Sequence, residues 1–105
     1  MDISIEILSE RFKLLGDKTR LSILALLRER DMCVCEFVEV LHCSQPGVSQ
    51  HLKKLKQANL VREYRKGHWI YYQLNKEEIP ELTIYMVDIP NLKKYIDQEQ
   101  VECEA

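Results

Sequence analysis

The 105-residue sequence lacks any long hydrophobic run, and no segment approaches the roughly 18 apolar residues of a membrane span. Residues 1–4 also lack the basic start and apolar core of a secretory signal peptide. Internal repeats and low-complexity segments are absent as well. We therefore expect a single domain with a cytoplasmic location and no membrane partner.

Cysteine is sparse, with four residues, and no Cys-x-x-Cys motif on a βαβ pattern is present. No convincing Cys/His/Asp constellation for nucleophilic catalysis is present either. We therefore expect that the protein is not an enzyme and uses no organic cofactor. In a reducing compartment, four cysteines are more typical of metal binding or redox chemistry than of a disulfide framework. Cys33 and Cys35, one residue apart, form a soft-ligand pair suited to a thiophilic ion.

The formal net charge of −2 hides an uneven distribution. Residues 44–73 carry six Lys or Arg against one Glu, which gives +5, whereas residues 1–43 carry −2 and residues 74–105 carry −5. A basic middle third between acidic ends is typical of a surface that binds a polyanion.

Hydrophobic periodicity predicts four helices followed by a β-hairpin and a C-terminal helical region. Gly16 ends the first helix and Asp17 caps the second. Asn75 is expected to cap the C-terminal region, which Pro90 breaks or kinks. We expect a folded domain over residues 1–98 and a mobile tail over 99–105. The predicted helices cover 3–15, 18–29, 31–41 and 44–58, and the predicted strands cover 60–65 and 69–74, joined by a turn at 66–68.

The fourth predicted helix has the character of a DNA-reading helix. Ser44 is a plausible N-cap, and Pro46 fits the first turn, where a missing N–H costs nothing. Helical spacing places an apolar stripe of Val48, Leu52 and Leu55, together with Asn59, on the inward side. The outward side is centred on Gln50 and holds amides, small residues and cations. The predicted base contacts are Gln45, Ser49, Gln50 and His51, the predicted phosphate contacts are Lys53, Lys54 and Lys56, and the predicted hairpin contacts are Arg65, Lys66 and His68.

The order of helices and hairpin is that of a winged helix-turn-helix domain. Six segments carry a family resemblance: Leu15-Gly16-Asp17-Lys18-Thr19-Arg20-Leu21, Cys33-Val34-Cys35-Glu36-Phe37, Ser44-Gln45-Pro46, Ser49-Gln50-His51-Leu52-Lys53-Lys54-Leu55, Ala58-Asn59-Leu60-Val61, and Gly67 through Leu74. In these segments the sequence resembles the arsenic-repressor (ArsR/SmtB) family of bacterial metalloregulators. The resemblance implies a mainly α fold with a β-hairpin wing, in a homodimer held by its first and last helices. Such a dimer would present two reading helices to operator DNA roughly 34–36 Å apart.

The resemblance also implies a repressor that leaves its operator when As(III) or Sb(III) binds cysteine thiolates. Residues i and i+2 of a regular helix project about 200° apart, so Cys33 and Cys35 could share an ion only if the helix start distorted. Arsenic-responsive relatives often have a third cysteine where Val38 stands. The predicted metal ligands are Cys33, Cys35 and Cys103, and a two-thiolate site completed by an exogenous ligand is the alternative. No His follows His68, so the zinc-type site that some relatives place on the last helix is not expected.

Two alternatives keep the same fold but change the signal. One is a repressor that senses Cd(II) or Pb(II). The other is a redox sensor, in which Cys43 or Cys103 would be the disulfide partner because a Cys-x-Cys disulfide is strained. Cys43 lies about 12 Å along a helix from Cys35, which makes it a poor ligand partner and favours a role as a small buried hydrophobe.

Overall fold

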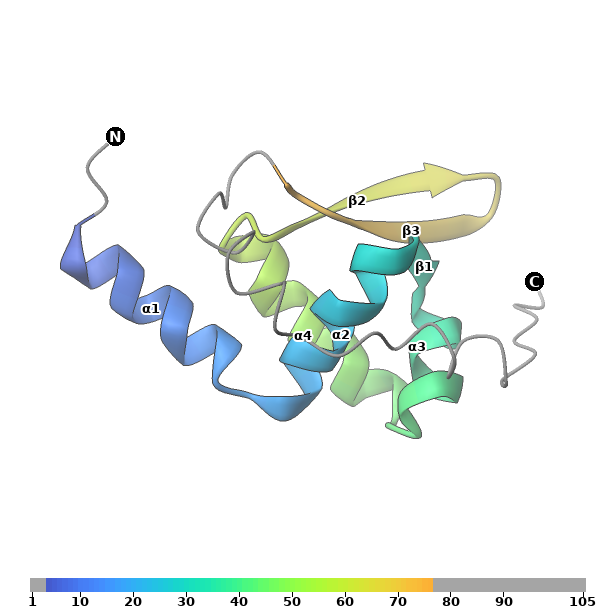
Figure 1. Cartoon of the computed structure of the whole chain (residues 1–105). Helices are drawn as coiled ribbons and strands as arrows, with labels where there is room; N and C mark the ends of the chain where they lie inside the picture. Colours follow the sequence, from blue (N-terminus) through green and yellow to red (C-terminus); the bar gives the residue numbers. More distant parts are fainter. Residues whose placement is uncertain (1–3, 77–105) are drawn as a thin grey trace.

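The computed structural model describes residues 4–76, with four helices and a three-stranded sheet (Figure 1). The predicted C-terminal helix, its kink at Pro90, the tail and Cys103 lie outside the described residues. So does the domain boundary at residue 98. The elements in chain order are α1 (Ile5–Leu15), α2 (Lys18–Glu29), β1 (Met32–Cys33), α3 (Val34–Leu41), α4 (Gln45–Gln57), β2 (Val61–Lys66) and β3 (Trp69–Leu74).

In three of the four helices, the residue just before the helix caps the first turn with its side chain. Ser4 accepts a hydrogen bond from the backbone N–H of Ile7 at 3.2 Å, and Asp17 accepts one from Arg20 at 3.0 Å. Ser44 Oγ accepts from the N–H of Gly47 at 3.1 Å. Each of these caps satisfies a backbone donor that the first turn of a helix leaves without an intrahelical partner. The predicted caps Asp17 and Ser44 are confirmed.

The prediction for the third helix is wrong at its start. Asp31 does not begin a helix; it leads into β1, and α3 begins only at Val34. Met32 pairs with Tyr72 and Cys33 pairs with Tyr71, so these two residues form a short strand antiparallel to β3. Local periodicity could not reveal this pairing, because the partner residues are far away along the chain.

The β-hairpin is confirmed, and β3 is the central strand of a sheet with the order β1-β3-β2. The register of the hairpin runs from the pair Val61 and Leu74 to the pair Lys66 and Trp69. Gly67 turns the chain with a φ of +65°, a conformation that side-chain-bearing residues rarely adopt. The hairpin projects beyond the helices as the wing in Figure 1.

A single hydrophobic core joins the helices to the base of the sheet. It takes its largest side chains from α2, α3 and α4 and from the start of β2. At the same end of the sheet, the Asn75 side chain donates a hydrogen bond to the carbonyl of Asn59 at 2.9 Å and so ties the end of β3 to the turn after α4. The fully buried core includes Ile23, Leu24, Leu26, Met32, Phe37, Val48, Leu52, Leu55 and Leu60.

Helix α1 differs from the other helices because none of its residues is buried in the single chain. Leu14 and Leu15 pack against the core, but Ile5 is 83% exposed, Ile7 53% and Phe12 47%. In Figure 1 the helix extends to one side of the helical core. None of the helices within residues 4–76 is long and apolar enough to cross a membrane.

Candidate functional site

Helix α4 separates an apolar side from a polar one. Val48, Leu52 and Leu55 are fully buried, as predicted. Asn59 is not part of this inward stripe: it lies beyond the helix, is exposed, and has a φ of +61° where the chain turns toward β2. The exposed side carries most of the predicted contacts on this helix, namely Gln45, Ser49, Gln50, Lys53 and Lys54.

His51 is placed differently from these five residues. Its side chain is half-buried, and its Nδ1 atom is enclosed without a hydrogen-bond partner within the described part of the chain. The backbone N–H of Arg20 lowers the pKa of Asp17, and the His51 imidazole lowers that pKa further by charge attraction. Because its ring is half-buried, His51 is less accessible to DNA than the exposed side chains of α4.

Lys56 is engaged within the protein. Its Nζ atom lies 2.5 Å from Oε1 of Glu63 on β2. This contact lowers the pKa of the Glu63 carboxyl group below its usual range. The ion pair joins the end of the helix to the wing, so Lys56 differs from Lys53 and Lys54, which are exposed on the outer side of the helix.

The tip of the wing presents the three predicted hairpin contacts together. Arg65 and Lys66 end β2, and His68 follows Gly67 in the two-residue turn; all three side chains are exposed. Tyr64 and Tyr71 stack lower on the hairpin with ring centroids 5.8 Å apart. Tyr72 packs against the core, so both this residue and the stacked pair contribute to packing within the wing and at its base.

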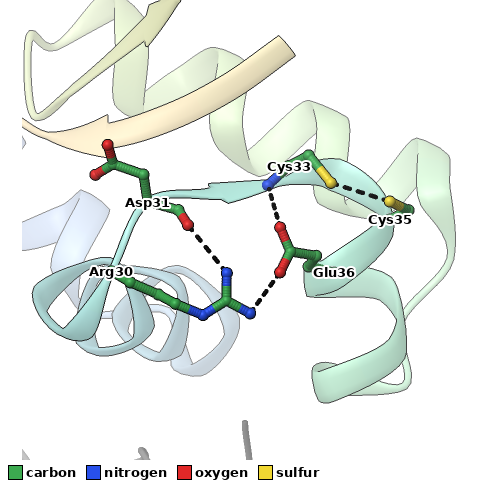
Figure 2. A network of polar contacts seen from close by, with 5 residues as sticks. All are labelled: Arg30, Asp31, Cys33, Cys35 and Glu36. Atoms are coloured by element: carbon green, nitrogen blue, oxygen red, sulfur yellow. Dashed lines mark hydrogen bonds and ion pairs between the residues drawn. The ribbon is translucent and has the colours of Figure 1, made fainter. Parts of the chain in front are cut away.

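The structure brings the two candidate thiol ligands together. The Sγ atoms of Cys33 and Cys35 lie 3.0 Å apart, facing each other at the start of α3 (Figure 2). Cys33 is buried and Cys35 is half-buried. Two thiolates that share one ion at bond lengths of roughly 2.3 Å and a tetrahedral angle lie about 3.7 Å apart. A small movement of the side chains would therefore bring both sulfurs within bonding distance of one ion.

The two cysteines are not both helical, so the premise that they lie on one regular helix is wrong. Cys33 is the N-cap of α3, with extended backbone angles of φ −95° and ψ 168°, so only Cys35 belongs to the helix. The separation of about 200° applies to residues that are both helical. The chain leaves β1 and enters α3 between the two cysteines, which provides the required departure from helical geometry.

The described residues place no third candidate ligand beside Cys33 and Cys35. Within residues 4–76, no three His, Cys, Asp or Glu side chains are grouped so that they could hold a metal ion. Cys43 is half-buried, packs against the core, and donates from Sγ to the carbonyl of Leu41 at 3.5 Å. This placement agrees with a packing role for Cys43.

A buried carboxylate lies beside the thiol pair, and its role was not predicted from the sequence. Glu36 Oε1 accepts a hydrogen bond from the Cys33 backbone N–H at 3.1 Å, and Oε2 lies 2.5 Å from the Arg30 guanidinium (Figure 2). A Glu three residues after an N-cap is the spacing of a capping box. The spacing from Cys33 to Glu36 is present in the sequence, but it identifies a capping box only when Cys33 is the N-cap, and the predicted helix starts at Asp31.

Comparison with known proteins identifies the family. Residues 17–63 match the family model described as "Bacterial regulatory protein, arsR family". The chain is 39% identical over 80 residues to the transcriptional repressor SdpR of Bacillus subtilis, covering 76% of this chain and 89% of that protein. This chain belongs to the arsR family of bacterial regulatory proteins. It is a DNA-binding transcriptional repressor of that family, and not an enzyme.

Two further comparisons support this assignment. The chain is 40% identical over 90 residues to the arsenic resistance transcriptional regulator ArsR1 of Pseudomonas putida, covering 85% of this chain. The match spans 66% of that relative's length. The crystal structure of Rv0081 from M. tuberculosis superposes with a TM-score of 0.72 at 27% identity, covering 93% of this chain and 97% of the other. The winged helix-turn-helix fold expected from the sequence is thereby confirmed.

Proposed function

We propose that this repressor is a cytoplasmic homodimer that leaves its operator when As(III) or Sb(III) binds the thiolates of Cys33 and Cys35. The observation that carries the proposal is the 3.0 Å approach of the two sulfur atoms. Thiolates select soft ions. The similarity to an arsenic resistance regulator supports the choice of metalloid.

The position of the pair gives ion binding a route to both DNA-contacting elements. Cys33 ends β1 and pairs with Tyr71 on β3, which leads back to the wing tip. Cys35 lies in the first turn of α3, which packs against α4. An ion that moves the two sulfurs relative to each other would therefore shift the wing and the reading helix with respect to one another.

The dimer is supported by the exposed apolar residues of α1. Ile5, Ile7 and Phe12 would lose contact with water if this helix packed against a second copy of the chain. A two-fold dimer would place two α4 helices in successive major grooves, with Gln45, Ser49 and Gln50 toward the bases and Lys53 and Lys54 toward phosphates. Arg65, Lys66 and His68 would then contact the flanking backbone or minor groove, while His51 contributes less because its ring is half-buried.

The test is a release titration on a DNA duplex that the unliganded protein selects from a random library. Under reducing conditions, we expect As(III) or Sb(III) to release the wild-type protein. The Cys33→Ser/Cys35→Ser variant should bind the duplex normally and resist release, because its hydroxyls are poor ligands for soft ions. Cys43→Ser is the matched control and should respond like wild type. Release of the double variant by As(III) would refute the assignment.

The same titration addresses ion selectivity and the third ligand. Running Cd(II) and Pb(II) beside As(III) distinguishes the metalloid sensor from a sensor of divalent ions. A Cys103→Ser variant that needs much more As(III) for release would support a three-thiolate site. An unchanged response would support two thiolates and an exogenous ligand.

Redox sensing is a second candidate, because the same sulfur proximity favours it. Oxidation by a peroxide would join Cys33 to Cys35 in a disulfide, with loss of two protons and two electrons to the oxidant. The 3.0 Å approach of the sulfurs favours this pair over Cys43 despite the strain of a Cys-x-Cys disulfide, and Cys103 stays an alternative partner. Thiol counting after peroxide treatment tests the candidate: loss of two thiols together with operator release would favour it over metalloid binding.

A further inference from the structure

The carboxylate of Glu36 is the most deeply buried charged group near the thiol pair, with 6% of the residue exposed. It is the third residue of α3 and follows Cys35 directly. Both of its oxygens are engaged: one accepts from the Cys33 backbone N–H and the other contacts the Arg30 guanidinium. A buried carboxylate is costly unless it is paired and hydrogen-bonded, so these two contacts explain how Glu36 is accommodated.

These contacts hold Cys33 in the conformation that brings the two sulfur atoms together. Cys33 must stay extended at the N-cap, since a helical Cys33 would direct its side chain about 200° away from that of Cys35. Two contacts hold Cys33 in this conformation. Its backbone N–H donates to Glu36 on α3, and its pairing with Tyr71 joins it to β3.

Arg30 in turn holds the carboxylate in place. Its guanidinium contacts Glu36 through one nitrogen and donates to the Asp31 carbonyl at 3.2 Å through another. Arg30 is the C-cap residue of α2, so the network ties the end of that helix to the start of α3 (Figure 2). The segment that carries Cys33 is therefore clamped between two helices and a strand.

We propose that Glu36 is the positioning residue of the thiol pair: its hydrogen bond to Cys33 presents both sulfurs to one bridging ligand. The importance of this role for sensing rests on the proposed function, but the positioning itself can be measured without DNA or a release assay. Glu36 does not bind the ion. It acts by holding a geometry in which one ligand can reach both thiols without first ordering the chain.

The test compares a ligand that needs two thiols with a reagent that needs one. Phenylarsine oxide binds a dithiol by forming two As–S bonds; the As–O bond is lost and the oxygen leaves as water with the two thiol protons, without any redox change. Iodoacetamide alkylates each thiol singly. Both are applied to the full chain with Cys43→Ser and Cys103→Ser, so that only the pair of interest reacts.

We expect Glu36→Ala to weaken phenylarsine oxide binding by about 10–100-fold, the usual cost of removing a group that orients metal ligands. The alkylation rates should stay within about threefold of the parent, as expected for a role in positioning. Glu36→Gln should retain most of the affinity, because its amide oxygen can still accept from the Cys33 N–H. Glu39→Ala is the matched control, one turn further along α3 and exposed, and should bind like the parent.

A second variant keeps the test decisive if Glu36→Ala fails to fold. Replacing a buried ion pair with apolar residues is often tolerated, so Arg30→Met/Glu36→Met leaves no unpaired charge yet lacks the acceptor for Cys33. It should show the same loss of phenylarsine oxide affinity. Affinity equal to the parent in either variant, or an equal loss in Glu36→Gln, would overturn the proposal. A repressor that ignores As(III) on DNA yet shows the predicted binding pattern would refute only the proposed function.

Discussion

Helices α3 and α4 follow each other in the chain but begin in different ways. At α4, Ser44 caps the first turn with its own hydroxyl. At α3, the N-cap is Cys33, whose backbone is held by Glu36 from inside the helix and by Tyr71 from the sheet. The start of α4 is therefore encoded by adjacent residues, and that of α3 also depends on tertiary structure. A ligand that disturbs a helix start held by contacts from other elements also disturbs those elements, and this property suits the proposed sensing role.

The two helices also differ in how they attach to the core. Helix α4 buries Val48, Leu52 and Leu55, whereas the only buried apolar residue of α3 is Phe37. The rest of α3 packs through half-buried side chains such as Val34 and Val38. Helix α4 is thus anchored by three buried side chains, and α3 depends heavily on one aromatic side chain.

The largest expected effect comes from removing that aromatic side chain. Phe37→Ala should lower the free energy of unfolding by about 3–5 kcal/mol, because Phe37 is fully buried and its loss leaves a cavity. Urea denaturation measures the change. Ile70→Ala, on an exposed part of β3, is the control and should have little effect. A loss below about 1 kcal/mol for Phe37→Ala would show that α3 is held mainly by the strand and the Glu36 network.

This difference explains what the sequence could and could not predict. Ser44, Pro46 and the apolar spacing that follows gave the position of α4 and its outward residues, because each signal is local. The start of α3 was misplaced, since Met32 and Cys33 become a strand only when β3 lies beside them. The same error hid the facing thiols, because a helix through both cysteines would have separated them. Glu36 could have been found from its capping-box spacing had the N-cap been placed at Cys33.

An intermediate effect is expected on the surface of α4. Gln50→Ala should reduce the preference for operator over scrambled DNA by about 1–3 kcal/mol, because a Gln side chain can pair with a base edge. Lys54→Ala is the matched variant on the same exposed side and should weaken binding to both duplexes, lowering the salt slope by about one. Binding to both duplexes over a salt series separates these results. An unchanged specificity ratio for Gln50→Ala would remove Gln50 from the base contacts.

The smallest effect concerns the contact that joins the wing to the segment before the thiols. The Tyr64 hydroxyl donates to Asp31 at 2.6 Å, and this hydrogen bond, with smaller contributions from burial and charge, raises the pKa of Tyr64 to about 12. Because the folded pKa lies above the unfolded one, the stabilisation is fully present below about pH 10 and is lost as the pH rises toward 12. Tyr64 is exposed, so Tyr64→Phe should barely change stability at pH 7.

Tyrosinate absorbance at 295 nm measures this ionisation directly. The difference between wild type and Tyr64→Phe should contain one tyrosine that ionises near pH 12. Asp31→Asn is the control that keeps the phenol and removes the charged acceptor, and it should move that ionisation back toward pH 10. A difference curve centred near pH 10 in the wild type would mean that the wing does not hold Asp31 in solution. The sheet pairing of Cys33 with Tyr71 would then be the main link from the wing to the thiol pair.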